Sequence, residues 1–125
     1  MALFTELEYQ SATIAAGQSL SGEVNLGEKQ LVAIYMPSSW TAADLTFQSS
    51  PDGGTTWCEL YTTDGAAADA AAAFQVHSPT ASLCIAIDPT KLRGVNCLKV
   101  RSGTSGSPVN QAAQAVLTLA TRGAL

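Results

Sequence analysis

Residues 40–61, WTAADLTFQSSPDGGTTWCELY, decide the fold class of this chain. Leu45, Phe47 and Ser49 alternate with polar neighbours, and a second alternating run covers residues 57–61. The segment SPDGG between the two runs has the proline, aspartate and glycines of a tight turn. Alternation on both sides of a glycine-rich turn predicts an antiparallel hairpin. The hairpin indicates an all-β protein, and it carries no pattern of reactive side chains.

Short apolar or alternating runs on either side of the hairpin predict the other strands. In chain order, the expected strands are residues 11–15, 19–26, 30–36, 45–49, 57–61, 82–87, 95–102 and 113–122. Residues 30–36, QLVAIYM, are apolar on both faces, which favours a central strand. About eight short strands at this spacing predict an antiparallel two-sheet β-sandwich with a jelly-roll-like topology.

Alternation also predicts which side chains point into the sandwich. The expected inward positions are Leu83, Ile85 and Ile87; Leu98 and Val100; and either Leu117 with Leu119 or Val116 with Ala120. Lys99 and Arg101 fall on the opposite side of their strand and are expected to be exposed. Asp88 precedes Pro89 and Gly94 follows, which predicts a single helical turn that Asp88 caps.

The first ten residues predict an arm rather than a strand. Leu3, Phe4, Leu7 and Tyr9 are apolar or aromatic and have no evident partner strand. We therefore expect residues 1–10 to form an N-terminal arm that contacts a neighbouring subunit through these four side chains. Residues 11–125 are expected to form a single β-sandwich domain.

Residues 66–73 are nearly all alanine. Alanine favours a helix by propensity, but eight residues are too few to hold a helix without support. We expect this segment to be a loop or a strand, and residues 74–76 after it to be extended.

The composition favours a subunit that buries much of its surface. The chain has 125 residues, of which only 13% are charged, and its formal net charge is −4. Globular domains usually carry about 25% charged residues, and so little charge is a solubility risk for a solitary protein. The six lysines and arginines are scattered, which argues against a nucleic-acid partner. No apolar run is long enough to span a membrane, and residues 1–10 do not resemble a signal peptide.

The candidate reactive residues each have a simpler structural explanation. Cys58, Cys84 and Cys97 lie in apolar strand contexts without metal-ligand spacing, so we expect buried, reduced thiols. His77 has no accompanying nucleophile motif and is expected to be a loop or edge residue. Asp52 could be imagined in a calcium loop, but turn formation explains it fully. We expect no metal, no cofactor and no enzymatic activity.

Two further features have competing interpretations. Residues 103–107, GTSGS, could suggest a phosphate cradle, but they lack the lysine and the strand-to-helix context of a P-loop. Trp40, Trp57 and Tyr61 could line a carbohydrate platform, while packing in the core or against another subunit is the favoured interpretation.

The sequence resembles a family of small proteins common in tailed bacteriophages and prophages. The pattern W-T-A-A-x-L-T-F-Q-x-S-x-D-G-x-x-x-W-x-x-L-Y, residues 40–61, carries the resemblance. Residues 85–89 (IAIDP), 98–104 (LKVRSGT), 108–113 (PVNQAA) and 117–119 (LTL) agree with it, so that it covers residues 12–122. The chain departs from the family at residues 66–73, where a stretch richer in threonine and valine would be more typical.

The resemblance implies a structural protein of the virion. We expect a capsid decoration (cement) protein that binds the assembled head shell, with the major capsid protein or other virion proteins as partners. The alternative is a tail or head-fibre module that binds a host receptor or a glycan. A homo-oligomer is expected, and a trimer would suit the threefold positions of a lattice. The protein would be found in the virion after assembly in the bacterial cytoplasm, with no nucleic-acid or membrane partner.

Overall fold

A computed structural model describes residues 7–63 and 71–123. Leu3, Phe4 and the larger part of the alanine-rich segment lie outside these residues. The strands are β1 (Leu7–Ile14), β2 (Val24–Asn25), β3 (Lys29–Tyr35), β4 (Leu45–Ser50), β5 (Cys58–Glu59), β6 (Tyr61–Thr62), β7 (Ala72–Ala73), β8 (Cys84–Ala86), β9 (Cys97–Ser102) and β10 (Ala115–Gly123). A 3₁₀ helix, η1, spans Pro89–Leu92.

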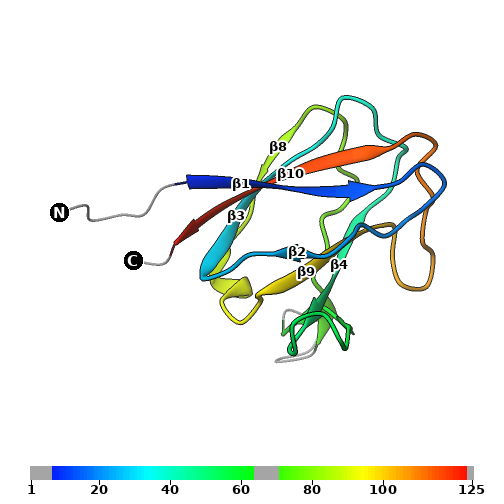
Figure 1. Cartoon of the computed structure of the whole chain (residues 1–125). Helices are drawn as coiled ribbons and strands as arrows, with labels where there is room; N and C mark the ends of the chain where they lie inside the picture. The colour runs from blue at the N-terminus through cyan, green and yellow to red at the C-terminus, as the bar shows by residue number, and fades with distance from the viewer. Residues whose placement is uncertain (1–6, 64–70, 124–125) are drawn as a thin grey trace.

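The strands form the expected antiparallel sandwich (Figure 1). The first sheet has the order β1-β10-β3-β8, and the second has the order β2-β9-β4-β5. Along the chain, β1, β3, β8 and β10 alternate with β2, β4 and β9 between the two sheets. This alternation is that of a jelly roll, so the predicted fold class is confirmed. The short pair β6-β7 adds a small third sheet, and Ala72–Ala73 confirms strand structure for the end of the alanine-rich segment.

The core lies between the two sheets and follows the predicted alternation. Leu98 and Val100 of β9 are fully buried, and so are Leu117 and Leu119 of β10. β3 is an interior strand, as predicted, but it contains a register irregularity opposite Ala120 and Thr121. The extra residue in β3 allows Leu31 and Ile34 to point into the same core although they are three positions apart.

The hairpin and the helical turn are both confirmed. β4 pairs with β5, with Gln48 opposite Glu59. In the connecting turn, Asp52 Oδ1 accepts hydrogen bonds from the backbone N–H groups of Thr55 (3.1 Å) and Thr56 (2.7 Å). At η1, Asp88 Oδ1 accepts the N–H of Thr90 at 3.0 Å, as expected of an N-cap.

The first strand begins earlier than predicted. Residues Leu7 to Gln10 continue β1 and pair with β10, from Leu7 opposite Arg122 to Ile14 opposite Ala115. These four residues therefore belong to the sandwich rather than to an arm. The alternation was hidden because the inward positions there are Glu8 and Gln10, beyond the end of the apolar core, where Glu8 Oε1 lies 3.2 Å from Lys29 Nζ.

Several orientation predictions are wrong, each for a local reason. Leu83 is 46% exposed because it precedes the edge strand β8, where the second sheet no longer covers it. Cys58 and Cys84 are exposed because they lie on the edge strands β5 and β8, while Cys97 is buried as predicted. Arg101 faces away from the core, as the alternation requires, yet it is only 7% exposed because neighbouring side chains cover it.

Candidate functional site

Compared with the outer face of the second sheet, the outer face of the first sheet carries fewer charges. Strand pairing places these side chains on it: Leu7, Tyr9, Ser11 and Thr13 of β1; Val116, Thr118, Ala120 and Arg122 of β10; Ala33 and Tyr35 of β3; and Cys84 and Ala86 of β8. Arg122, at one end, is the one charged residue in this set. We refer to this set as the outer face of the first sheet. Tyr9, Tyr35 and Val116 are exposed in it, although they are large and apolar or aromatic.

Two tyrosines form the centre of this outer face. The rings of Tyr9 and Tyr35 meet edge to face, with centroids 6.2 Å apart and planes inclined by 67°. They are 57% and 41% exposed, while Ala120 between their strands is almost completely covered. A hydrogen bond with the Cys84 side chain raises the pKa of Tyr35 above its ordinary value, which favours the neutral phenol. The centre of the face is therefore aromatic, uncharged and accessible.

The outer face of the second sheet has a different character, because its charges are paired within the chain. Arg101 of β9 donates two hydrogen bonds to the Glu59 carboxylate on β5, at 2.5 and 2.7 Å. Gln48 of β4 donates a third to the same carboxylate at 2.8 Å. Arg101 holds the pKa of Glu59 below its usual range. The pairing covers Arg101 and leaves this ion pair little charge to offer a partner.

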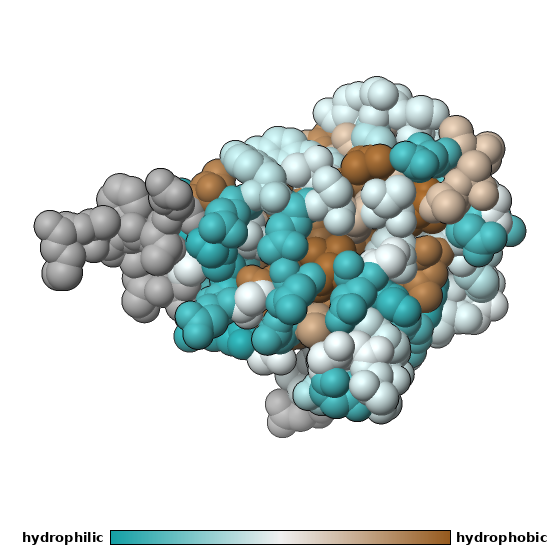
Figure 2. All heavy atoms as spheres, in the orientation of Figure 1, coloured by the Kyte–Doolittle hydropathy of each residue, from teal (hydrophilic) through white to brown (hydrophobic). Residues whose placement is uncertain are grey.

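A second cation on this face is also engaged. Lys99 Nζ lies 4.5 Å from the ring centroid of Trp57, within the range of a cation–π interaction. The indole N–H of Trp57 donates to the Gly54 carbonyl at 3.0 Å, which fixes the ring beside the hairpin turn. In the view of Figure 2, teal and pale residues cover most of the visible surface, and brown apolar residues show in several separate places.

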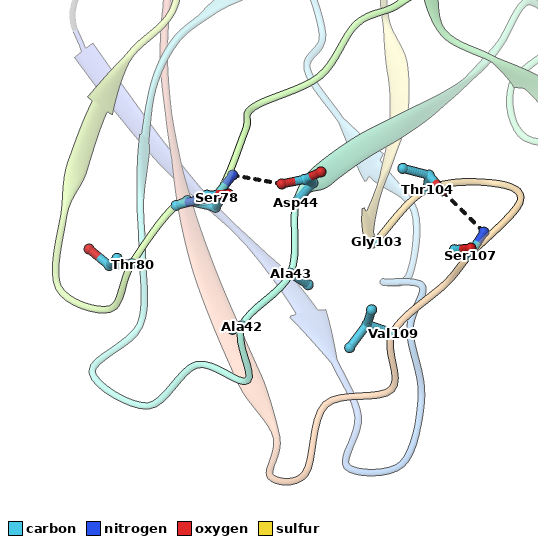
Figure 3. A pocket seen from close by; sticks show the side chains of 10 residues that line it. Ala42, Ala43, Asp44, Ser78, Thr80, Gly103, Thr104, Ser107 and Val109 are labelled. Atoms are coloured by element: carbon cyan, nitrogen blue, oxygen red, sulfur yellow. Dashed lines mark hydrogen bonds between the residues drawn. The ribbon is translucent and has the colours of Figure 1, made fainter.

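A cavity of about 470 Å³ opens at one end of the sandwich (Figure 3). Three loops line it: residues 42–44, 78–80 and 103–109. Asp44 Oδ1 accepts the backbone N–H of Ser78 at 2.7 Å, and Oδ2 accepts the Gln75 side chain at 2.8 Å. The N–H of Ser78 holds the pKa of Asp44 below its usual range. Asp44 thus ties the loops together, and small side chains such as Ala42 form much of the wall.

His77 does not complete a catalytic arrangement at this cavity. Its Nδ1 is 4.0 Å from Asp44 Oδ2, which is beyond hydrogen-bond distance, and 77% of its side chain is exposed. A triad needs a carboxylate that orients the imidazole by a hydrogen bond. Within residues 7–63 and 71–123, no group of three or more histidine, cysteine, aspartate or glutamate side chains could hold a metal ion.

The three candidate platform aromatics have separate environments. Trp40 packs against the core, and its buried indole N–H has no hydrogen-bond partner among the described residues. Trp57 is held by Lys99 and Gly54, as described above. Tyr61 of β6 is 53% exposed. Residues 103–107 form a tight connection, in which Gly103 (φ 92°) approaches the backbone of Ser107 closely.

Of the four predicted interface residues, Leu7 and Tyr9 lie on the outer face of the first sheet, and Leu3 and Phe4 are outside the described residues. Sequence reasoning missed Tyr35, Val116 and Thr118. The signal was present in QLVAIYM, residues 30–36, which is apolar on both faces. Only one face of that strand is buried in this chain, and the other face is partly or largely accessible.

Comparisons with known proteins support the fold. No protein-family model matches the chain, and no curated protein sequence matches it. The chain is similar in structure to the SPBc2 prophage-derived protein YomS, with a TM-score of 0.55 and 14% sequence identity. The match covers 98% of this chain and 100% of YomS, so the two share their fold over nearly the whole length. The described part of the chain contains no helix with the length and apolar character needed to cross a membrane.

Proposed function

We propose that this chain is a structural protein of a bacteriophage virion that decorates and stabilises the assembled head shell. The observation that carries the proposal is the outer face of the first sheet, which is uncharged apart from Arg122 and exposes Tyr9, Tyr35 and Val116. Aromatic residues are enriched, and charged residues depleted, at the centres of protein interfaces. This face is therefore suited to bind another protein.

The kind of partner is inferred from the fold and the composition. The structural neighbour YomS is prophage-derived and matches this chain from end to end. Jelly rolls are common in viral capsid proteins. With only 13% charged residues, the chain is suited to remain packed against neighbours. These observations together favour the major capsid protein, or another virion protein, as the partner, and a homo-oligomer as the bound form.

The stabilisation would follow from mass action. A subunit that binds the assembled lattice, and not the separated shell proteins, adds its binding free energy to the lattice. If it bridges neighbouring shell subunits, it resists their separation under internal pressure. No covalent step and no cofactor is needed. The predicted contact of Leu3 and Phe4 with a neighbour would extend the same interface.

A tail or head-fibre module that binds a receptor or a glycan is the second candidate. Tyr61 is exposed and lines a groove of about 370 Å³ together with Thr62, Thr63, Thr90 and Lys91. An aromatic ring beside hydroxyl groups and an amine is suited to stack on a sugar ring and donate hydrogen bonds to it. Such a module would be present in few copies per particle.

The test uses particles made by a phage from which the gene for this chain has been deleted. The purified full-length chain is added, free protein is removed by sedimentation, and copies per particle are counted by quantitative densitometry. We expect many copies on heads and retention of DNA to higher temperature than in the deleted particles. Absence from heads, or a few copies at the tail, would overturn the decoration proposal.

A pair of single-charge variants tests which surface binds. Val116→Lys places a charge on the outer face of the first sheet, and Lys99→Ala removes one from the outer face of the second sheet. We expect Val116→Lys to lose binding to heads while remaining folded, and Lys99→Ala to bind as the wild type does. The reverse pattern would assign binding to the second sheet.

A further inference from the structure

The two main sheets have four edges, and one differs from the others in length. β8 has three residues, and β2 and β5 have two each. β1 has eight residues and pairs along its whole length with β10 on one side only. Very short edge strands offer little backbone to a second chain, whereas a long one exposes a row of unpaired N–H and C=O groups. β1 is therefore the edge most able to accept another strand.

The backbone groups that face this edge can be identified from the hydrogen bonds on the other side of the sheet. Met36 N–H donates to the Leu83 carbonyl at 2.7 Å, and Ile87 N–H donates to the Val32 carbonyl at 2.9 Å. Residues along a strand alternate in the direction of their backbone groups. The backbone N–H and C=O groups of Val32 and Met36 therefore point toward β8. Because Tyr35 is an odd position between them in this alternation, its backbone groups must point toward β10.

The alternation then continues across β10 to β1. Tyr35 is paired with Thr118, so the backbone N–H and C=O groups of Thr118 point toward β3. The backbone groups of the next residue, Leu119, therefore point toward β1. Leu119 is paired with Gln10, which places the backbone groups of Gln10 inside the sheet. The odd-numbered residues, Tyr9, Ser11 and Thr13 among them, therefore direct N–H and C=O groups to the free edge. Within the described residues, no backbone hydrogen bond reaches these groups from another strand.

Within the described residues, this edge also lacks three common features that prevent association, namely lysine, proline and a bulge. The sequence of β1, LEYQSATI, has no lysine and no proline, and its pairing with β10 runs without a register shift. Natural edge strands are commonly protected by lysine, proline or a bulge. The single charge is Glu8, which already forms an ion pair with Lys29 of the same chain.

We propose that a second copy of this chain pairs with β1 through its own β1, antiparallel and about a two-fold axis perpendicular to the sheet. Directly opposed residues in a sheet point to the same face, so the pairing must keep odd residues opposite odd ones and even opposite even. The two such registers with the greatest overlap place Gln10 or Ser11 on the axis. In these, Glu8 lies opposite Ala12 or Ile14, and no like charges meet.

The dimer would join the two four-stranded first sheets into one sheet of eight strands. It would also bring the two outer faces together as one continuous surface, with Arg122 of each copy as its charged residue and with two pairs of Tyr9 and Tyr35. A two-fold pairing gives a dimer, because the three-residue β8 offers too short an edge for the head-to-tail contact that a trimer would need. The inference concerns the isolated chain and goes beyond shell binding.

The experiment measures the mass of the full-length chain by light scattering over a concentration series that extends well above the micromolar range. We expect about twice the monomer mass of 12.9 kDa at the high end. Ser11→Pro removes an N–H that faces the free edge and none that pairs with β10, and proline is tolerated at such edge positions. This variant should remain folded and monomeric, while Ser11→Ala should dimerise as the wild type does.

The Val116→Lys variant distinguishes two ways in which two copies could associate: pairing of their β1 edges, or packing of their outer faces against each other. Val116 lies on the interior strand β10, so the lysine variant should still dimerise even where it fails to bind heads. A monomeric wild type at all concentrations would overturn the proposal. A Ser11→Pro dimer, or a monomeric Val116→Lys variant, would also overturn it, the second in favour of face-to-face packing.

Hydrogen exchange of the wild-type chain gives a readout that does not depend on a variant folding. We expect the amide protons of Tyr9, Ser11 and Thr13 to become more protected as the concentration rises. The amide protons of Gln10 and Ala12, which are already paired with β10, should change less. Unchanged exchange at the three odd positions in a sample that contains dimer would place the contact elsewhere and overturn edge pairing.

Discussion

Each of the two sheets has four antiparallel strands, but the outer faces of the sheets differ in their charged residues and in how those residues are paired. On the second sheet, Arg101 and Glu59 neutralise each other, and Lys99 lies over Trp57. On the first sheet, Tyr9 and Tyr35 contact each other and remain exposed. The second face is completed within the chain, whereas the first leaves aromatic surface without cover from the described residues.

Under the proposed function, we expect this difference to separate residues that stabilise the chain from residues that bind other subunits. Changes on the second outer face break contacts within the chain, so they should lower the free energy of unfolding. Changes on the first outer face remove little that the isolated chain needs, so they should affect binding to other subunits. Four predictions test the comparison.

The largest effect is expected from Glu59→Ala. This change leaves the guanidinium of Arg101, only 7% exposed, without its carboxylate partner. An uncompensated buried charge is strongly destabilising, and because the Glu59 side is partly open to water we expect a loss of about 3 kcal/mol. Chemical denaturation at neutral pH measures it.

The double variant Glu59→Ala/Arg101→Met is the matched control. With both charges replaced, no buried charge is left unpaired, and the stability should return to within about 1 kcal/mol of the wild type. If Glu59→Ala alone were as stable as the wild type, the second outer face would not depend on its ion pair, and the contrast between the sheets would fail.

Gly103→Ala tests the connection that follows the last residue of β9. Gly103 has φ 92°, and a Cβ there would lie 2.5 Å from the Ser107 carbonyl oxygen. Both the backbone conformation and the contact disfavour alanine, and a loss of about 2 kcal/mol is expected. Gly106→Ala in the same loop meets no atom within 4 Å and should change stability by less than about 0.5 kcal/mol. Equal effects of the two variants would contradict the tight packing at Gly103.

Replacing both Tyr9 and Tyr35 by serine tests the first outer face. The rings contact each other rather than the core, so the denaturation midpoint should change much less than with Glu59→Ala. Binding to heads should fall about tenfold or more, as is common when an interface aromatic is truncated. Sedimentation with particles measures the binding. A large loss of stability without a loss of binding would assign these rings to the fold alone.

Much of the fold could be predicted from local pattern. The hairpin, the turn at Asp52, the cap at Asp88 and the inward positions Leu117 and Leu119 depend on residues close in sequence. The start of β1 could not, because Glu8 occupies an inward position whose partner, Lys29, lies on another strand.

The candidate surface was predictable only in part, because exposure depends on partners distant in sequence. Alternation places Arg101 and Tyr35 on outward positions alike. Arg101 is covered because Glu59, 42 residues away, reaches it from β5. Tyr35 stays accessible because the residues paired with it, Cys84 and Thr118, are small. The alternation predicts on which face of the sheet a side chain lies. Contacts with residues distant in sequence decide whether that side chain is covered.

The smallest effect is expected at Asp52, in the hairpin turn of the second sheet. Hydrogen bonds from Thr56 and Ser50 lower the pKa of Asp52 from 3.8 to about 2. The folded state therefore favours the ionised carboxylate, and its contribution to stability is present above about pH 4 and is lost as the pH falls toward 2. Asp52→Asn keeps an oxygen acceptor but does not titrate, so its free energy of unfolding should fall less over this range than that of the wild type. Urea denaturation at a series of pH values measures both slopes. Identical slopes would show that the hairpin turn does not prefer the ionised form of Asp52. The polar contacts at the turn would then stabilise the second sheet less than the Arg101–Glu59 ion pair does.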